Sequence, residues 1–162
     1  MKVNIINHFD LKKVMARLNK NIPRMINDAA GIIKSDISDG IKYGRNIDGS
    51  PFKTLKAQTI KAKRRKGSPH PRRVLYDTGM MQNTYMKRRA TRTRMSAILK
   101  VANKRSYAIK GYKGGIGQLH HEGGANHPKR PWFGISKTAS ANIKKDLRIN
   151  IKHALGKEWK LS

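Results

Sequence analysis

Hydrophobic residues near the start of the chain recur at steps of three and four positions, the spacing of one face of an α-helix. The pattern predicts a long amphipathic helix between Asp10 and Ser38, with Asp10 as N-cap and Gly40 closing it. Pro23 lies inside the pattern, so we expect a kink or a restart near Asn21. The hydrophobic positions are Leu11, Val14, Met15, Leu18, Ile22, Met25, Ile26, Ala29, Ile33 and Ile37.

The same spacing returns near the other end of the sequence. Ser136 to Leu155 is predicted to form a second helix, which Gly156 ends. Its apolar positions are Ala139, Ile143, Leu147, Ile151 and Leu155.

The middle of the chain carries a pattern typical of strands. Asn83–Arg89 and Met95–Ala102 are candidate strands, and the second alternates apolar and polar residues. Arg88–Arg94 lies between them as a basic turn, so the two segments are predicted to form a hairpin. Tyr107–Ile109 is a candidate third strand.

The remaining segments are rich in glycine and proline. Residues 40–73 are predicted to form an extended basic arm, with one short helix near Thr54–Arg65. Leu75–Gln82 is predicted to be a turn that enters a short helix, capped by Asp77 or Thr78. Six glycines predict that Gly111–Gly124 is irregular, and Pro128–Trp132 is expected to be extended. The whole, residues 1–162, is predicted to be one α+β domain: a long N-terminal helix, a small antiparallel sheet, a C-terminal helix and the basic arm.

Charge is the feature of the composition that most narrows the function. The 162 residues include 37 Lys and Arg against nine Asp and Glu, a formal net charge of +28. No acidic residue lies between Asp48 and Asp77, or between Asp77 and Glu122. A solvated face normally mixes both signs, so these tracts indicate close approach to a polyanion, DNA above all, or to acidic neighbouring proteins. Because motifs that read base edges are missing, any contact with DNA is expected to be with phosphates and to weaken with salt.

No catalytic or cofactor site is predicted. The chain has no cysteine, paired carboxylates are scarce, and neither a P-loop nor a nucleophile elbow is present. His120, His121, Glu122 and His127 cluster in sequence, but their spacing matches no established zinc motif. Polar or packing roles in a turn are favoured over a metal site, and a metal-dependent nuclease built on these four residues is the least favoured function. The sequence also has no apolar run that predicts a signal peptide or a membrane span, so we expect a soluble protein made in the cytoplasm.

Three separated blocks of sequence together resemble a known family. They are Asp48–Leu55, then Val74–Met81, and then a third that comprises Tyr107–Ala108, His120–Gly123 and Pro128–Ser136. Their order and spacing are similar to the phage virion-morphogenesis family, the tail-completion proteins of Mu-like and P2-like contractile-tailed phages. The resemblance covers roughly residues 40 to 155.

The chain departs from the family pattern at several positions. Phe52 stands where Trp is usual, Met81 where Leu is usual and Glu122 where Gln is usual. Trp132-Phe133 replaces the usual Phe-Leu, and the stretch between Tyr107 and His120 is longer than is typical. The substitutions preserve bulk or polarity, so the resemblance implies the same fold but leaves the geometry of that loop open.

The resemblance implies a structural protein of the head–tail junction, with no catalytic residues to carry over. We expect a homo-oligomeric ring, of six copies by analogy with tail symmetry, that contacts portal, neck and tail proteins in the virion. The alternative function is a non-specific nucleic-acid-binding protein. The candidate cations facing DNA or partners are Lys53, Lys56, Lys61, Lys63, Arg64, Arg65, Lys66, Arg72, Arg73, Arg88, Arg89, Arg92 and Arg94, and the candidate interface or packing anchors are Phe52, Leu55, Trp132 and Phe133.

Overall fold

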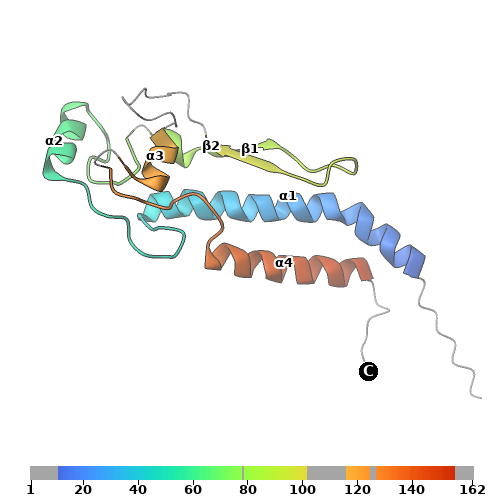
Figure 1. The fold of residues 1–162 in the computed structure, drawn as a ribbon. Helices are drawn as coiled ribbons and strands as arrows, with labels where there is room; N and C mark the ends of the chain where they lie inside the picture. Colours follow the sequence, from blue (N-terminus) through green and yellow to red (C-terminus); the bar gives the residue numbers. More distant parts are fainter. Residues whose placement is uncertain (1–10, 78, 102–115, 125–126, 156–162) are drawn as a thin grey trace, which may run out of the picture.

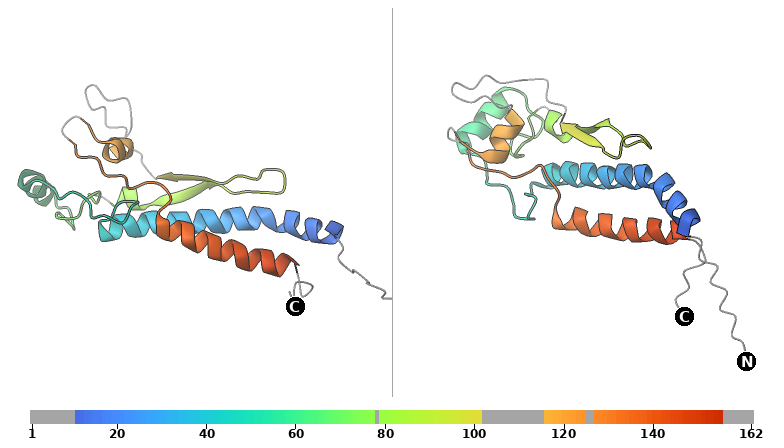
Figure 2. Two further views of the ribbon diagram at one scale, coloured as in Figure 1. Left: turned by 60° about the horizontal axis from the view of Figure 1, so that its bottom comes forward. Right: turned by 45° about the vertical axis from the view of Figure 1, so that its right-hand side comes forward.

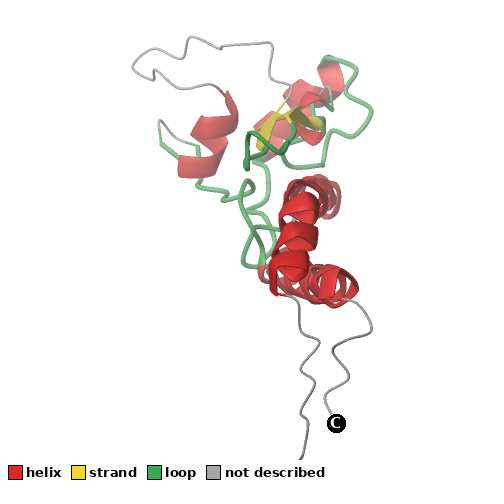
Figure 3. Cartoon of the chain, turned by 90° about the vertical axis from the view of Figure 1, so that its right-hand side faces the viewer, coloured by secondary structure: helices red, strands yellow, loops and turns green. Residues whose placement is uncertain are grey.

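The structure is a computed structural model that describes residues 11–77, 79–101, 116–124 and 127–155. One long helix, α1 (Leu11–Tyr43), runs through the middle of the molecule. A two-stranded hairpin lies along one side of α1, and a second helix, α4 (Lys137–Leu155), lies along the other (Figure 1). Viewed along this helix pair, the other elements gather on one side of it (Figure 3). The fold is α+β, as predicted.

The long helix α1 extends further than its sequence pattern predicted. It continues through Gly40 to Tyr43, because Ile41 is buried with 1% exposure and prolongs the apolar stripe. Gly44 ends the helix with a φ of 71°, and the amide of Arg45 donates to the carbonyl of Gly40 at 2.9 Å, the closure expected of a helix that ends on a left-handed glycine. The prediction that Gly40 closes α1 was therefore wrong by one turn.

Pro23 does not divide the helix into two. α1 is continuous across it, with Pro23 in its interior. The first turns of α1, in dark blue, are bent relative to the rest (Figure 1). A bend is the expected consequence of a proline that lacks an amide hydrogen and crowds the preceding turn. The expected kink is present, and the restart is not.

The second long helix, α4, begins at a side-chain cap and buries two small residues. The Ser136 hydroxyl accepts a hydrogen bond from the amide of Ala139 at 3.0 Å and caps the helix. Ala139 and Ala154 are its two buried residues, one near each end. α4 lies alongside α1, and the two helices are in contact (Figure 2).

The hairpin consists of β1 (Thr84–Arg88) and β2 (Ile98–Val101), as predicted. The strands are antiparallel, with Thr84 opposite Val101 and Tyr85 opposite Lys100, and a bulge lies between Met86 and Arg88. A single 3₁₀ turn, η1 (Met80–Gln82), precedes the hairpin. The expected third strand at Tyr107–Ile109 lies outside the described residues, as do the expected caps Asp10 and Thr78 and the stop at Gly156.

Two short helices complete the described fold. The first, α2 (Ala57–Arg65), lies where a short helix was predicted. The second, α3 (Ile116–Glu122), occupies a stretch predicted to be irregular. That prediction was wrong because Leu119 is fully buried, and this tertiary contact outweighs the low helix propensity of the glycines around it. Gly123 ends α3 with a φ of 80°, and a Cβ there would lie 2.9 Å from the amide nitrogen of Lys129.

The largest buried cluster lies at one end of the molecule, around the last turns of α1, while Val14, Met25 and Ala154 are buried further along the two long helices. Ile37, Ile41, Phe52, Leu75 and Trp132 form a single buried cluster. Ile33, Val74, Met81 and Phe133 pack against it. The other end consists of the first turns of α1, the end of α4 and the tip of the hairpin, and has fewer layers (Figure 2).

Candidate polyanion-binding surface

The basic hairpin, defined here as residues Thr84–Val101, presents one covered face and one open face. Thr84, on the face toward α1, is 3% exposed. Tyr85 and Lys87 alternate with it on the open face, and Lys100 lies opposite Tyr85 in the neighbouring strand. The covered face places the hairpin on α1, and the open face is left for solvent or a partner.

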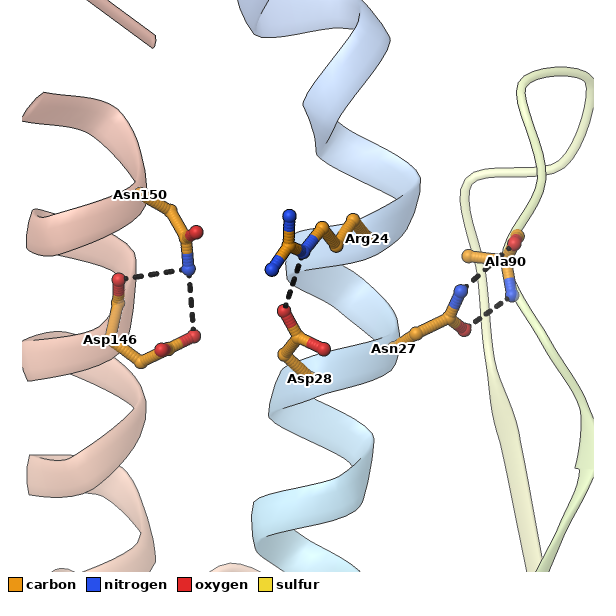
Figure 4. Close-up of polar contacts among 6 residues, drawn as sticks. All are labelled: Arg24, Asn27, Asp28, Ala90, Asp146 and Asn150. Atoms are coloured by element: carbon orange, nitrogen blue, oxygen red, sulfur yellow. Dashed lines mark hydrogen bonds and ion pairs between the residues drawn. The ribbon is translucent and has the colours of Figure 1, made fainter. Parts of the chain in front are cut away.

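The tip of the basic hairpin is fixed to α1 by one side-chain amide. The Asn27 side chain donates from Nδ2 to the carbonyl of Ala90 at 3.1 Å and accepts from the amide of Ala90 at 2.8 Å (Figure 4). Ala90 is 5% exposed. Both backbone groups of a buried residue are thereby satisfied, which holds the tip in one position.

The turn beyond Ala90 is also ordered by its own backbone. Thr91 and Arg94 exchange two hydrogen bonds, at 2.8 and 3.1 Å, and close a tight loop around Arg92 and Thr93. The guanidinium groups of the turn therefore project from a defined support.

The open face and the tip carry uncompensated positive charge. The basic hairpin contains six Lys and Arg and no Asp or Glu. Within the described residues, the ion pairs Arg24–Asp28 and Arg45–Asp36 both lie outside it. The ammonium of Lys100 lies close enough to Lys87 to lower the pKa of the Lys87 side chain. Like charges held this close on an ordered face favour binding of an anion between them.

A second group of cations surrounds α2, in the arm of residues 40–73. Its exposed members are Lys53, Lys56, Lys61, Arg64, Arg65, Lys66, Arg72 and Arg73. This group lies beyond the C-terminal end of α1, whereas Ala90, where the hairpin turn begins, lies beside Asn27 in the middle of the helix, and the turn extends from there toward the first turns of α1 (Figure 1). The structure thus separates the predicted basic residues into two surfaces. Arg88, Arg89, Arg92 and Arg94 of the hairpin are all exposed as well.

Lys63 does not belong to either surface, and the prediction that it faces DNA or a partner was wrong. It is 9% exposed, and its ammonium donates to the carbonyl of Arg73 at 2.7 Å and to the carbonyl of Tyr76. Burial lowers the pKa of the ammonium, and Asp77 acts in the opposite direction. Lys63 ties α2 to the turn in which Leu75 adopts a left-handed φ of 55°, a conformation rare for a non-glycine residue. The role of Lys63 is structural.

Arg130 is a second buried cation, and no sequence pattern indicated its burial. It is 3% exposed, and its Nε and Nη2 donate to the carbonyl of Lys53 at 3.2 and 3.0 Å. Its backbone amide donates to the carbonyl of His120 at 2.8 Å. Arg130 therefore joins the arm, α3 and the proline-rich segment before α4.

The histidine cluster of the sequence does not assemble into a metal site in the described part of the chain. The rings of His120 and His127 meet edge to face with centroids 5.4 Å apart, and Nδ1 of His121 accepts from the amide of Phe133 at 3.4 Å. Burial, with Arg130, His127 and Lys63 nearby, lowers the pKa of His120 to about 4. A neutral, half-buried imidazole among cations is a packing element.

A model of the phage virion morphogenesis family matches residues 8–152, nearly the whole chain. The chain belongs to this family. It therefore has a role in the assembly of the phage virion, as expected from the sequence blocks, although no curated protein and no solved structure matches it. No helix in the described residues has the length and apolarity needed to cross a membrane.

The three blocks that resemble the virion morphogenesis family meet in the core. Phe52 comes from the first, Leu75 from the second and Trp132 from the third, and all three belong to the same buried cluster. The indole Nε1 of Trp132 donates to the carbonyl of Gly117 at 3.0 Å. Of the four predicted anchors, Phe52 and Trp132 are core residues, while Phe133 and Leu55 are half-buried. In this member of the family the blocks specify the fold.

Proposed function

We propose that this virion morphogenesis protein is a structural component of the head–tail junction and forms a homo-oligomeric ring that joins the tail to the head. The observation that carries the proposal is the family match over residues 8–152. We further propose that the protein catalyses no reaction, and that its role is to hold neighbouring proteins together.

The distribution of apolar residues supports association with other chains. The main buried cluster occupies one end of the molecule, and large apolar side chains are exposed both near it and along the rest of the chain. Those in the described residues are Met15, Tyr43, Tyr85, Met95, Ile135, Ile149 and Ile151, with exposures between 40% and 68%. Single exposed apolar residues are ordinary, but a thin molecule with many of them gains stability when copies pack side by side.

The charge supports a place among anionic neighbours. A monomer with a net charge of +28 repels itself and attracts polyanions. A neck ring is in contact with the genome that passes through it and with other virion proteins, and either supplies negative charge. We expect the basic surfaces to point toward those neighbours.

Light scattering of the purified chain, coupled to size-exclusion chromatography, tests the ring, and imaging of the particle neck tests its location. We expect a closed oligomer in solution and density for the protein at the head–tail junction. A protein absent from purified virions would refute the proposal. Ile149→Ser removes an exposed apolar side chain from α4, and the conservative Ile149→Val is its matched control; weaker association of the first variant alone would place the contact between copies on α4.

The alternative, a non-specific nucleic-acid-binding protein, is favoured by the six cations of the basic hairpin, whose sequence contains no acidic residue. It predicts tight, salt-sensitive binding to any DNA by the isolated chain, without a ring and without a position in the particle. The same chromatography and a virion protein profile separate the two functions.

A further inference from the structure

We infer that the basic hairpin, rather than the cations around α2, is the element that binds duplex DNA, and that it does so through the phosphates without reading sequence. The inference rests on the proposed function in so far as that function brings DNA to the protein.

The chemistry of the hairpin matches a partner that only accepts hydrogen bonds. Between Thr84 and Val101 the sequence contains six Lys and Arg, but no Asp, Glu, Asn or Gln. The other exposed polar side chains are those of Tyr85, Thr91, Thr93 and Ser96, whose hydroxyls can donate; the hydroxyls of Thr91 and Thr93 lie 3.2 Å apart and share one hydrogen bond. Phosphate oxygens are acceptors only, and contacts from Arg, Lys, Thr, Ser and Tyr are those that hold a duplex backbone.

An acidic protein fits this surface less well. Protein interfaces have an apolar centre and a mixture of donors and acceptors, since each backbone presents both. The exposed large apolar residues of the basic hairpin are Tyr85 and Met95, at 46% and 48%, and charge surrounds them. No side-chain amide or carboxylate is available in the hairpin sequence to accept a hydrogen bond from a partner's amide.

The geometry excludes insertion of the whole ribbon into a DNA groove. A two-stranded ribbon can enter the major groove when both its faces are free. Here Thr84 is buried toward α1, and Asn27 holds Ala90 at the tip. The face with Lys87 and Lys100, and the turn with Arg92, remain to contact the backbone, so binding has no source of base specificity.

The cations around α2 differ in their surroundings. An acidic residue lies next to this group: the charge of Asp77 acts on Lys63, which belongs to α2 although it is not part of the exposed surface. The described part of the basic hairpin contains neither a buried lysine nor an acidic residue. The hairpin therefore keeps its full charge for a ligand, on a support that is already ordered.

The test compares two variants of equal charge. R88Q/R89Q/R92Q/R94Q removes four cations from the hairpin, and K61Q/R64Q/R65Q/K66Q removes four from the α2 surface. Fluorescence anisotropy with a duplex of random sequence measures the dissociation constant across a range of salt. We expect the hairpin variant to bind about tenfold or more weakly, with a salt slope smaller by roughly 0.9 for each phosphate that it no longer neutralises, and the α2 variant to change much less. Equal losses in the two variants, or a larger loss in the α2 variant, would overturn the inference.

A charge-neutral variant tests the role of the support. Asn27→Ala releases the tip without changing net charge, and hydrogen exchange at the amide of Ala90 reports whether the tip has been freed. We expect several-fold weaker binding to DNA once that amide exchanges faster; unchanged binding with a freed tip would contradict the inference.

The inference and the proposed function fail separately. If the hairpin variant binds DNA normally but no longer enters virions, the hairpin binds a virion protein and the inference is wrong, while the neck function stands. If the chain stays monomeric and absent from virions while the hairpin variant no longer binds DNA, the inference holds and the neck function fails.

Discussion

The buried cations of this molecule and the exposed cations of the basic hairpin differ in the groups that surround their charge. Lys63 and Arg130 are buried, and backbone carbonyls of Arg73, Tyr76 and Lys53 accept their hydrogen bonds. The cations of the basic hairpin are exposed, and the ion pairs of the described residues, Arg24–Asp28 and Arg45–Asp36, do not include them. The first kind stabilises the fold, and the second is free for a partner. The net charge of +28 thus includes cations that stabilise the fold and cations that are free for a partner, and the sequence does not distinguish the two.

Replacement of Lys63 by Met should give the largest effect. The change keeps the length of the side chain but leaves two carbonyls without their donor, which costs roughly 2–3 kcal/mol of unfolding free energy. Lys61→Met, on an exposed position of the same helix, is the matched control and should change stability little. Thermal or urea unfolding measures both, and equal stabilities would mean that Lys63 is not a structural cation.

A fall in pH should lower the stability of the fold through another basic group, the half-buried imidazole of His120. His120 faces Arg130, His127 and Lys63, and its pKa is lowered to about 4. The folded state therefore favours the neutral ring, so stability is fully present above the unfolded pKa near 6.5 and falls as the pH drops from there toward 4.

The His120→Asn variant measures this contribution. It should lose less stability than the wild type between pH 6.5 and 4, and His153→Asn, an exposed position on α4, is the control. Melting temperatures at several pH values would show the difference. Parallel curves for wild type and His120→Asn would contradict the assignment.

A smaller loss of stability is expected when the tip of the hairpin is released. Asn27→Ala removes two hydrogen bonds to Ala90 and should cost about 1 kcal/mol, because the tip can move and its freed backbone groups can reach water. Asn21→Ala is the control, since that side-chain amide donates within its own helix, to the carbonyl of Arg17. Chemical unfolding compares the two, and an equal loss in both would mean that the link between α1 and the hairpin adds nothing.

The contrast between the two kinds of cation also marks the limit of what the sequence could predict. Periodicity found α1, the hairpin and α4, because each has one face turned toward the rest of the fold along a regular repeat. Lys63 and its neighbours Arg64 and Arg65 look alike in sequence, and only the fold shows that Lys63 points inward. The burial of Arg130 was missed for the same reason: the carbonyl to which it donates belongs to Lys53.

Contacts between distant segments account for the other misses. Leu119 lies in a glycine-rich stretch, and the buried site that it fills makes α3 a helix. The pairing of Asn27 with Ala90 spans 63 positions, and a lone Asn within a helix pattern does not indicate its partner. The predicted anchors lie in the sequence blocks that resemble the family, whereas the choice between core and interface needed the cluster around Ile41.

The smallest effect concerns the like charges on the open face of the hairpin. Lys100 lowers the pKa of Lys87 because the two ammonium groups repel each other. Lys87→Gln removes that repulsion and should raise the melting temperature slightly at low salt, with the gain disappearing at high salt as screening replaces it. The affinity for DNA should decrease, since the same lysine is proposed to contact phosphate.

Lys145→Gln, an exposed change on α4, is the control and should alter the melting temperature and the affinity for DNA less than Lys87→Gln does. If Lys87→Gln gains stability and loses affinity for DNA, Lys87 serves ligand binding and destabilises the free protein. Lys63→Met, in contrast, should lose stability. A loss of stability in Lys87→Gln would show that Lys87 is a structural cation, and the distinction between the buried cations and those of the hairpin would then fail.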